Sequence, residues 1–444
     1  MLLLAIFGSL ALAEDPRDAE LFGEPAPEAP VAPPPEAALQ ATMRELEDRF
    51  TLGGRLWLQT QANVPEGTSD PADVTLDAPS RLDLYADARP NDRVRAYASG
   101  RLTHDFTIRD TDTDPFTGAP LASETVLLDQ LTLKFDAAHR VFVTVGRQRI
   151  LWGVGRFWNP TDFLNQQRLD PLAVFDVRTG VDLLKVHVPV ESANANFYAI
   201  GNFEDAQTLA EIGGALRAEV AFGQTELTAS GALRAGTAQQ LGVTLSSGVG
   251  PFDLALEAAI QHGSPDPHYA GRFDLATLTL PRTVDRSTAW LPQVVARIEA
   301  SIPYGAEDSL IVGVEYFRNE LGYDSAELLP WLIANGAFTP LYFGRDYAGG
   351  YALLAAPGRA DDHTFIASVL SNLSDRSLIA RLDWRARALT WLEPNVFVAA
   401  SGGGNGELHF SYEVAPQPLI PGLEEGISVP APFVTVGAGA VARF

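Results

Sequence analysis

The run Arg93-Val94-Arg95-Ala96-Tyr97-Ala98-Ser99-Gly100-Arg101-Leu102 decides the fold, because its polar and apolar residues alternate strictly. Successive side chains of a β-strand point to opposite faces, so one face of this run is apolar and the other carries three arginines, a tyrosine and a serine. The same division recurs at 81–89, 294–302 and 377–385. The chain is therefore predicted to form amphipathic strands rather than helices.

Alternation alone leaves two environments open for the apolar face. In a soluble sandwich this face is buried and the charged face meets water, whereas in a membrane barrel the apolar face meets lipid and the charged face lines the lumen. The connections distinguish the two, because tight turns and long loops nearly alternate along the chain. This pattern is typical of an outer-membrane barrel, with tight turns at the periplasmic end and long loops outside.

The predicted fold is a single transmembrane antiparallel up-and-down β-barrel over 49–444, with about 18 strands and 16 as the alternative count. The strands are expected near 50–63, 80–89, 92–103, 125–135, 140–151, 180–190, 194–202, 214–222, 225–235, 238–248, 251–262, 289–302, 308–318, 363–372, 376–386, 391–401, 406–412 and 432–444. The long loop 319–362 is expected outside, and the turns 373–375 and 402–406 at the periplasmic end. Two short outer connections, near Gly236 and Leu389, depart from the pattern.

The N-terminal residues differ in composition from the barrel. Residues 1–13 have the apolar core and small-residue end of a secretory signal peptide, although no basic residue precedes the apolar run, and a membrane anchor is the alternative. Residues 14–48 are acidic and proline-rich, which predicts an extended periplasmic linker with a short helix where Leu39, Met43 and Leu46 recur. This linker could bind a periplasmic partner, plug a pore, or serve as a solvated tether.

Composition excludes several classes of function. Acidic residues number 56 and basic residues 32, which argues against nucleic acid as a partner, and the chain contains no cysteine, which excludes disulfides and thiolate metal sites. The sequence contains no Gly-x-Ser-x-Gly, His-Glu-x-x-His or Walker motif. No catalytic residue, metal site or cofactor is therefore predicted.

The most distinctive stretch is 146–162, in which Gly-Arg-Gln-Arg-Ile-Leu-Trp-Gly is followed by Asn-Pro-Thr-Asp. It resembles porin-like outer-membrane families, including alginate-export-type channels, in which a G-R-Q-x-[IL]-x-W-G strand end precedes an N-P-x-D loop. The resemblance implies a loop that folds into the barrel mouth and brings there Arg147, Arg149, Trp152, Arg156, Asn159 and Asp162. A hydrogen bond between Arg147 and Asp162 that pins the loop is the alternative to contact with a solute.

Strand register complicates this expectation. Strict alternation places Arg147 and Arg149 on the face of Val143 and Val145, which would turn both arginines toward lipid. Either they lie at the level of the lipid headgroups, or a bulge at Gly146 exchanges the two faces.

A second set of candidates faces the predicted lumen. Fixed charges of opposite sign across a narrow lumen orient and sort polar solutes, whereas a salt-bridged interior that conducts little is the alternative. The pore-lining candidates are Arg93, Arg95, Arg101, Arg297, Glu299, Arg381, Asp383 and Arg385. The carboxylates Asp83, Asp87 and Glu315 are expected on the same luminal face.

The C-terminal run 433–444 alternates and ends on Phe444, which resembles the signal by which outer-membrane barrels bind their assembly machinery. The chain is thus predicted to be an exported porin-like channel of the Gram-negative outer membrane for small polar or amphiphilic solutes, and not an enzyme. A non-conducting structural or docking barrel and a barrel hydrolase are the alternatives. Expected partners are outer-membrane lipid, lipopolysaccharide, the assembly machinery, a periplasmic partner of 14–48 and further copies of the chain.

Overall fold

The computed structural model describes residues 49–113, 119–165, 167–168, 171–172, 178–274, 277, 279–304, 308–416 and 425–444. The predicted signal peptide 1–13 and linker 14–48 lie outside the described residues. Within the described ranges, no helix is long and apolar enough to cross a membrane.

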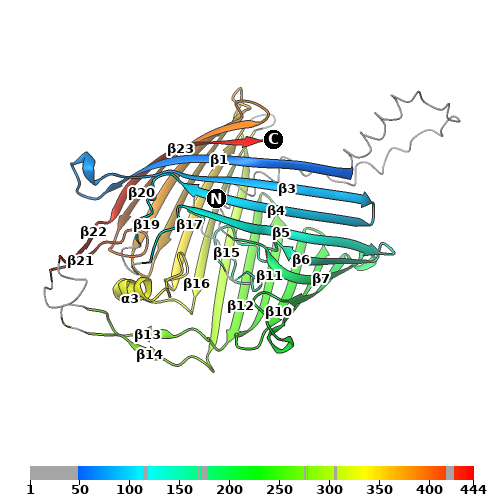
Figure 1. Cartoon of the computed structure of the whole chain (residues 1–444). Coiled ribbons are helices and arrows are strands. Elements are labelled where there is room, and N and C mark those ends of the chain that lie inside the picture. The colour runs from blue at the N-terminus through cyan, green and yellow to red at the C-terminus, as the bar shows by residue number, and fades with distance from the viewer. Residues whose placement is uncertain are drawn as a thin grey trace.

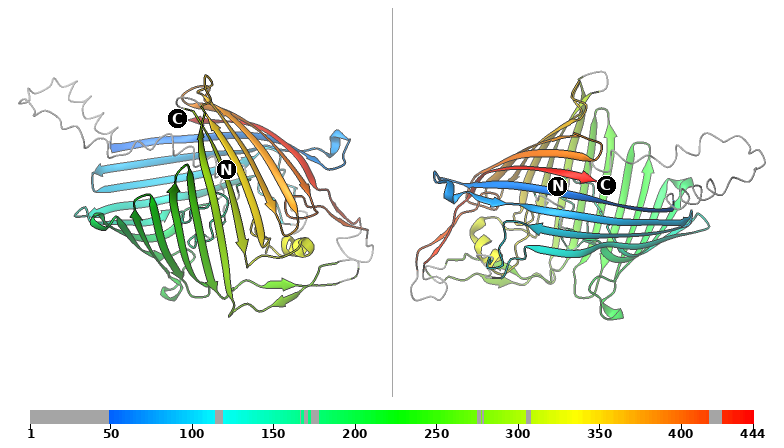
Figure 2. Two further views of the ribbon diagram at one scale, coloured as in Figure 1. Left: turned by 180° about the vertical axis from the view of Figure 1, so that it is seen from behind. Right: turned by 45° about the horizontal axis from the view of Figure 1, so that its top comes forward.

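The protein is a closed antiparallel β-barrel (Figure 1), as the alternation predicts. Nineteen strands belong to its sheet, of which the short β2 (Thr75–Asp77) only pairs with the loop end of β1 (Phe50–Pro65), and the other eighteen form the wall. The wall closes because β1 pairs along its length with the last strand, β23 (Pro432–Arg443), and these strands lie side by side in Figure 2. Closure leaves no backbone edge of the wall unpaired.

The remaining wall strands pair in chain order. They are β3 (Pro79–Asn91), β4 (Val94–Asp105), β5 (Glu124–Ala137), β6 (Val141–Gln148), β7 (Val181–Val190), β8 (Ala195–Asn202), β9 (Gly213–Phe222), β10 (Thr225–Leu233), β11 (Gln239–Val249), β12 (Phe252–His262), β15 (Trp290–Pro303), β16 (Ser309–Asn319), β17 (Asp346–Ala355), β18 (His363–Asn372), β19 (Ser377–Ala386) and β20 (Leu392–Gly403).

The two faces of the wall follow the alternation in the sequence. On β11, Leu241, Val243 and Leu245 are exposed on the outer face, whereas Thr244 between them is buried on the inner face. An outer face of exposed leucines and valines is unfavourable in water and favourable against acyl chains. The fold therefore requires an apolar surrounding for its outer surface.

The predicted strand at 406–412 is wrong, and the strand β17 was not predicted. The alternating apolar residues Leu408 and Phe410 lie in a loop, where they pack against buried clusters rather than against lipid. In β17 the inner face carries Tyr347, Tyr351 and Leu353, all buried, so the strand lacks the contrast of a charged and an apolar face. The two errors compensate, and the predicted total of about 18 strands is confirmed.

The missed strand also inverts the end at which three connections lie. The turn 373–376 lies at the long-loop end, where Ser374 Oγ accepts the N–H groups of Arg345 and Asp346. The connection at Leu389 consequently lies at the short-turn end, and it no longer departs from the alternation of short and long connections. Residues 402–406 lead from β20 into the long connection before β23, so they lie at the long-loop end and not at the periplasmic end. The predicted positions of all three connections are therefore wrong.

The long loops carry their own secondary structure, which gathers at one end of the barrel in Figure 1. It consists of the hairpins β13 (His268–Ala270) with β14 (Arg282–Val284) and β21 (Tyr412–Val414) with β22 (Ile427–Val429), and the helix α3 (Leu329–Ala334). Among the described residues, 3₁₀ turns lie in the long loops at Pro71–Asp73, Leu209–Glu211 and Ala326–Leu328, and in the short turn between β7 and β8 at Glu191–Ala193. The helix is held by a small core of Leu328, Leu329, Leu332 and Phe343.

Phe444 lies directly beside the first strand. Its N–H donates to the carbonyl oxygen of Gly54 at 3.1 Å, and its own carbonyl accepts the N–H of Gly54 at 2.8 Å. A Cβ at Gly54 would lie 2.7 Å from the Phe444 ring and 2.9 Å from the backbone carbonyl oxygen of Asp83, so this glycine lets the two strands and the ring approach closely. The last residue thus takes part in closing the barrel, and its role as an assembly signal stays a prediction.

Candidate functional site: a loop across the lumen and a cavity beside it

The connection from β6 to β7, described at 149–165, 167–168, 171–172 and 178–180, folds into the barrel. We call these described residues the loop 149–180. On the near side, Trp152 and Leu164 pack against inward-facing Val181, Leu183 and Ile200 of β7 and β8. These wall residues are apolar although they face the lumen, because the loop covers them.

On the far side, Phe157 and Trp158 are fully buried against the inner faces of β15 to β18. The indole of Trp158 stacks on Phe317 with ring centroids 5.7 Å apart, and its Nε1–H donates to the carbonyl of Leu341 at 2.9 Å. A Cβ at Gly349 would lie 2.6 Å from the Phe157 ring, so this glycine makes room for the loop. The loop therefore spans the lumen from one wall to the other.

Two buried carboxylates of the far wall hold the loop by its backbone. Glu257 of β12 accepts the N–H groups of Val154 at 2.8 Å and Thr161 at 2.7 Å, and also the Thr161 hydroxyl at 2.8 Å. Glu315 of β16 accepts three consecutive N–H groups, those of Arg156 at 2.6 Å, Phe157 at 3.0 Å and Trp158 at 2.9 Å. Hydrogen bonds to an ionised acceptor are about twice as strong as neutral ones. Glu257 and Glu315 together anchor the loop.

Arg147 does not face the lumen. The register of β6 with β5 and β7 has no shift at Gly146, so Arg147 stays on the outer face, opposite Leu131, which is 55% exposed. There it pairs with Asp182 at 2.7 Å and Glu204 at 3.3 Å, at the long-loop end of the wall. Two expectations are therefore corrected, because Arg147 neither lies in the mouth nor binds Asp162.

Arg149 follows the last residue of β6 and turns toward a luminal carboxylate. A bulge in β5 between the partners of Ser99 and Gly100 projects Asp129, which binds Arg149 at 3.0 Å and Arg101 at 3.7 Å. This pairing requires no bulge at Gly146, since Arg149 lies beyond the strand.

The remaining loop candidates hold the loop in shape. The guanidinium of Arg156 lies 4.2 Å above the ring of Tyr351, and burial lowers its pKa. The backbone N–H of Asn159 donates to the hydroxyl of Tyr342 at 3.2 Å. Burial raises the pKa of Asp162 to about 6, although both its oxygens accept the side-chain N–H groups of Asn165 at 2.8 Å.

Most of the predicted pore-lining residues pair with a carboxylate of the same strand or of a neighbouring strand rather than across the lumen. Arg381 binds Asp383 at 2.8 Å, Arg297 lies 3.7 Å from Glu299, and Arg95 binds Asp87 at 2.7 Å. Arg385 follows Asp383 on the same face of β19. Arg101 is buried against Asp83 and Asp129, and Arg93 lies in the turn before β4.

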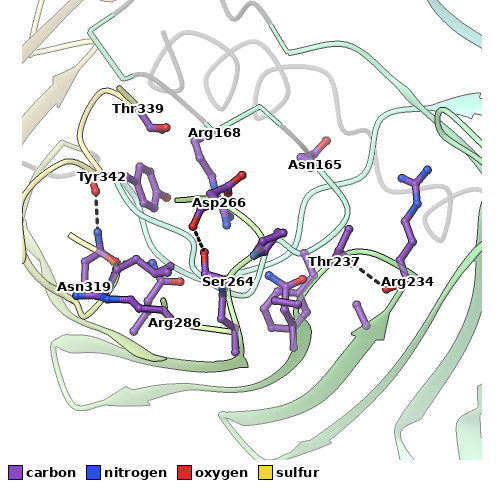
Figure 3. Close-up of a pocket in the computed structure, with 18 of the residues that line it drawn as sticks. Asn165, Arg168, Arg234, Thr237, Ser264, Asp266, Arg286, Asn319, Thr339 and Tyr342 are labelled. Carbon is purple, nitrogen blue, oxygen red and sulfur yellow. Dashed lines mark hydrogen bonds between the residues drawn. The ribbon is translucent and has the colours of Figure 1, made fainter. Parts of the chain in front are cut away.

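A cavity of about 480 Å³ lies between the loop 149–180 and the long-loop ends of β8 to β16 (Figure 3). Three arginines line it, and each donates to a backbone carbonyl: Arg168 to Asp162 at 3.2 Å, Arg234 to Glu211 at 3.0 Å and Arg286 to Glu320 at 3.0 Å. Asp266 is the one carboxylate among the described lining residues. The cavity is therefore cationic and lined with amide and hydroxyl groups, among them Asn165, Thr237, Gln261, Gln293, Asn319 and Tyr342.

The titration of His268 agrees with this charge. It lines the same cavity, and burial together with Arg286 and Arg345 lowers its pKa to about 4. His268 is therefore neutral at physiological pH, and the arginines alone supply the positive charge.

Of the two anchors, Glu315 was expected on the luminal face beside the pore-lining arginines but not as an anchor of the loop, whereas Glu257 and the cavity arginines were not singled out from the sequence. Glu257 does carry a signal, since it stands between Ala255 and Ala259 on the inner face, in the middle of a largely apolar strand. Its partners, however, lie about a hundred residues away in the chain, and no local pattern joins them. In the described part of the chain, no group of three His, Asp or Glu residues is placed to hold a metal ion.

Comparison with known proteins identifies the architecture. No protein-family model and no curated protein matches the sequence. Among solved structures, the fold is similar to OccK2 (OpdF) of Pseudomonas aeruginosa, with TM-score 0.53, 11% identity and coverage of 90% of this chain and 98% of that chain. It is also similar to OccAB4 of Acinetobacter baumannii, with TM-score 0.53, 9% identity and coverage of 89% and 98%, and to a BenF-like porin of Pseudomonas fluorescens Pf-5, with TM-score 0.52, 12% identity and coverage of 88% and 98%. The chain therefore shares the closed eighteen-strand barrel of these proteins over nearly its whole described length.

Proposed function

We propose that this protein is a porin-like channel of the Gram-negative outer membrane that passes small polar or amphiphilic solutes without chemical change. The observation that carries the proposal is the loop 149–180, held across the lumen of a closed barrel by Glu257 and Glu315. Such a loop narrows the interior until a solute has to contact protein side chains. A barrel that served only as a structural support would not need an anchored loop inside it.

The cavity at the long-loop end supports the same function. Its arginines, amides and hydroxyls can bind the polar groups of a solute, while Phe163, Leu233 and Leu321 offer apolar contact. Ligand sites usually combine a mostly apolar lining with a few placed polar groups. A solute entering at this end would therefore meet a binding surface before the loop.

The similar proteins agree with a channel of this kind. OccK2 was crystallised in complex with glucuronate, and the protein from P. fluorescens is described as a BenF-like porin. A closer relation to alginate-export channels is also part of the proposal, and it rests on the residues 146–162 alone. We further propose that lipid and lipopolysaccharide contact the apolar outer face, and that the strand ending at Phe444 binds the assembly machinery.

Conductance in a planar bilayer tests the proposal. The purified protein should give discrete conductance steps, and their absence would favour a docking barrel. Replacing Arg93 and Arg95 with glutamine should shift the reversal potential in a salt gradient toward cation preference, because two positive charges leave the short-turn mouth. The matched control is Arg147→Gln, which removes one positive charge from the outer face and should leave the reversal potential unchanged. An unchanged potential in the double variant would remove Arg93 and Arg95 from the pore wall.

A further inference from the structure

A second cavity, of about 640 Å³, opens at the short-turn end of β3 to β6. Its lining contains five cationic side chains, those of Arg49, Arg89, Arg93, Arg95 and Lys134, against the two carboxylates Asp92 and Asp136. We call it the basic cavity. Its excess of positive charge is unusual in a chain whose net charge is −24.

The carboxylates near the basic cavity leave part of this charge unmatched. Asp87 binds both Arg89 at 2.9 Å and Arg95 at 2.7 Å, and Asp136 binds His139 at 3.2 Å. In the part of the chain that the structure describes, neither Arg93 nor Lys134 has a carboxylate within 4 Å. The basic cavity therefore presents two cations to an anionic partner.

The chain itself carries the complementary charge next to this site. The segment 14–48 contains ten acidic residues and two basic ones, which gives a net charge of −8 before Arg49. Arg49 is both the residue that follows this segment and part of the lining of the basic cavity. The acidic residues are Glu14, Asp15, Asp18, Glu20, Glu24, Glu28, Glu36, Glu45, Glu47 and Asp48, and the basic ones are Arg17 and Arg44.

We propose that the segment 14–48 binds the basic cavity of its own barrel, with carboxylates among Glu45, Glu47 and Asp48 contacting Lys134 and Arg93. Four extended residues span about 13 Å, so Glu45 can reach across the cavity from Arg49. Covalent attachment through a short connection also gives an effective concentration in the millimolar range, at which weak ion pairs become populated. The segment thereby covers positive charge on the luminal wall at the short-turn end.

Zero-length cross-linking of the full chain in detergent tests this proposal without any measurement of transport. A carbodiimide joins a carboxylate to an amine only where the two are in contact, and the chain has just two lysines, Lys134 and Lys185. The expected product joins a peptide of 14–48 to Lys134. Lys185 lies two strands further along the wall, because Lys134 of β5 pairs with Thr144 of β6, which in turn pairs with Lys185 of β7. Lys185 therefore serves as the internal reference and should react less.

Charge and salt then separate specific binding from chance contact. Raising the salt from about 0.1 M to about 1 M shortens the Debye length from about 10 to about 3 Å, so the yield at Lys134 should fall severalfold. Arg93→Glu should lower the yield by a similar factor. The matched control is Arg359→Glu, an exposed arginine in the turn between β17 and β18, which should leave the yield unchanged.

Lys134→Arg keeps the charge and removes the amine, so it must abolish the product if the site is assigned correctly. No product between 14–48 and Lys134, an equal yield at Lys185, or a yield indifferent to salt and to Arg93→Glu would each overturn the proposal. Because none of these readouts depends on conductance, failure of the channel function would leave this result unaffected.

Discussion

Replacing Glu315 with glutamine should release the loop 149–180 from the far wall of the barrel. One oxygen of Glu315 accepts the N–H groups of Phe157 and Trp158, and the other accepts the N–H of Arg156 at 2.6 Å. Glutamine keeps a single acceptor oxygen and presents an NH₂ group in place of the other. One of the three bonds is lost, and two donors then face each other in a buried site.

The size of the effect follows from these bonds. A hydrogen bond to a charged group contributes about 1.5–3 kcal/mol, and a buried donor left unsatisfied costs about 1–3 kcal/mol. Removal of the buried charge offsets part of this loss, because an ionised carboxylate is costly to desolvate. The net destabilisation of the docked loop is therefore about 2–4 kcal/mol, which raises the undocked population roughly 30- to 700-fold.

Limited trypsin digestion measures this population. Arg156 is only 8% exposed in the docked loop, so cleavage after it requires release of the loop. When opening and closing are fast relative to cleavage, the cleavage rate follows the open population, and the 156–157 cut should accelerate by that same factor in Glu315→Gln. The matched control is Glu393→Gln, which removes another inward carboxylate, one bound to Arg443 of β23. A cleavage rate unchanged in Glu315→Gln, or raised equally in Glu393→Gln, would refute the anchoring role.

Two further variants test a glycine of the wall and a buried carboxyl group of a long connection. Gly146→Ala should destabilise the folded barrel, because φ at this residue is +109° and a Cβ would overlap the carbonyl oxygen of Leu131. A heat-modifiability gel measures this effect. The control Gly100→Ala should be tolerated, since the atom nearest to its Cβ would lie 3.8 Å away. Glu407 lies in the connection after β20, where its carboxylate accepts the Tyr347 hydroxyl at 2.6 Å and the Asn372 amide at 2.9 Å, and burial raises its pKa to about 7. The folded state therefore keeps a proton that the unfolded chain releases above its ordinary pKa, and stability should fall as the pH rises from the ordinary glutamate pKa to about 7. Thermal unfolding measured at acid pH and at neutral to alkaline pH should show this fall in stability. Glu407→Gln should reduce the fall, whereas replacement of the exposed Glu413 by glutamine should not. A pH response in Glu407→Gln equal to that of the unchanged protein would show that Glu407 is not the group responsible.

The barrel could be predicted because its determinant is local. A strand in contact with lipid on one face and with water or charge on the other must alternate, and the run 93–102 shows this directly. Strand β17 could not be found in this way, since Tyr347 and Tyr351 on its inner face are covered by the loop rather than by water. Its apolar inner face is a consequence of tertiary packing, and no pattern within the strand records it.

The site was predictable only in part, for the same reason. The stretch 146–162 was expected to form a loop in the mouth, and Trp152 and Arg156 do belong to a loop inside the barrel. The alternation did place Arg147 on the outer face. The arginine is tolerated there because it lies near the long-loop end of the wall and pairs with Asp182. The carboxylates that hold the loop lie far from it in the chain, about a hundred residues away for Glu257 and more than 150 for Glu315. Only the closed barrel brings them into contact with the loop.

The anchors Glu257 and Glu315 grip amide hydrogens, a group that every amino acid except proline possesses. A half-buried residue such as Val154 can therefore be exchanged for another with the attachment intact, provided that Gly155 is kept, where a Cβ would overlap the Trp158 carbonyl oxygen. The groups that fix the loop 149–180 in place are therefore largely different from the side chains that it exposes to the lumen. Varying the exposed side chains of the loop would change what a solute contacts, while the attachment, made mainly through backbone N–H groups, stays the same.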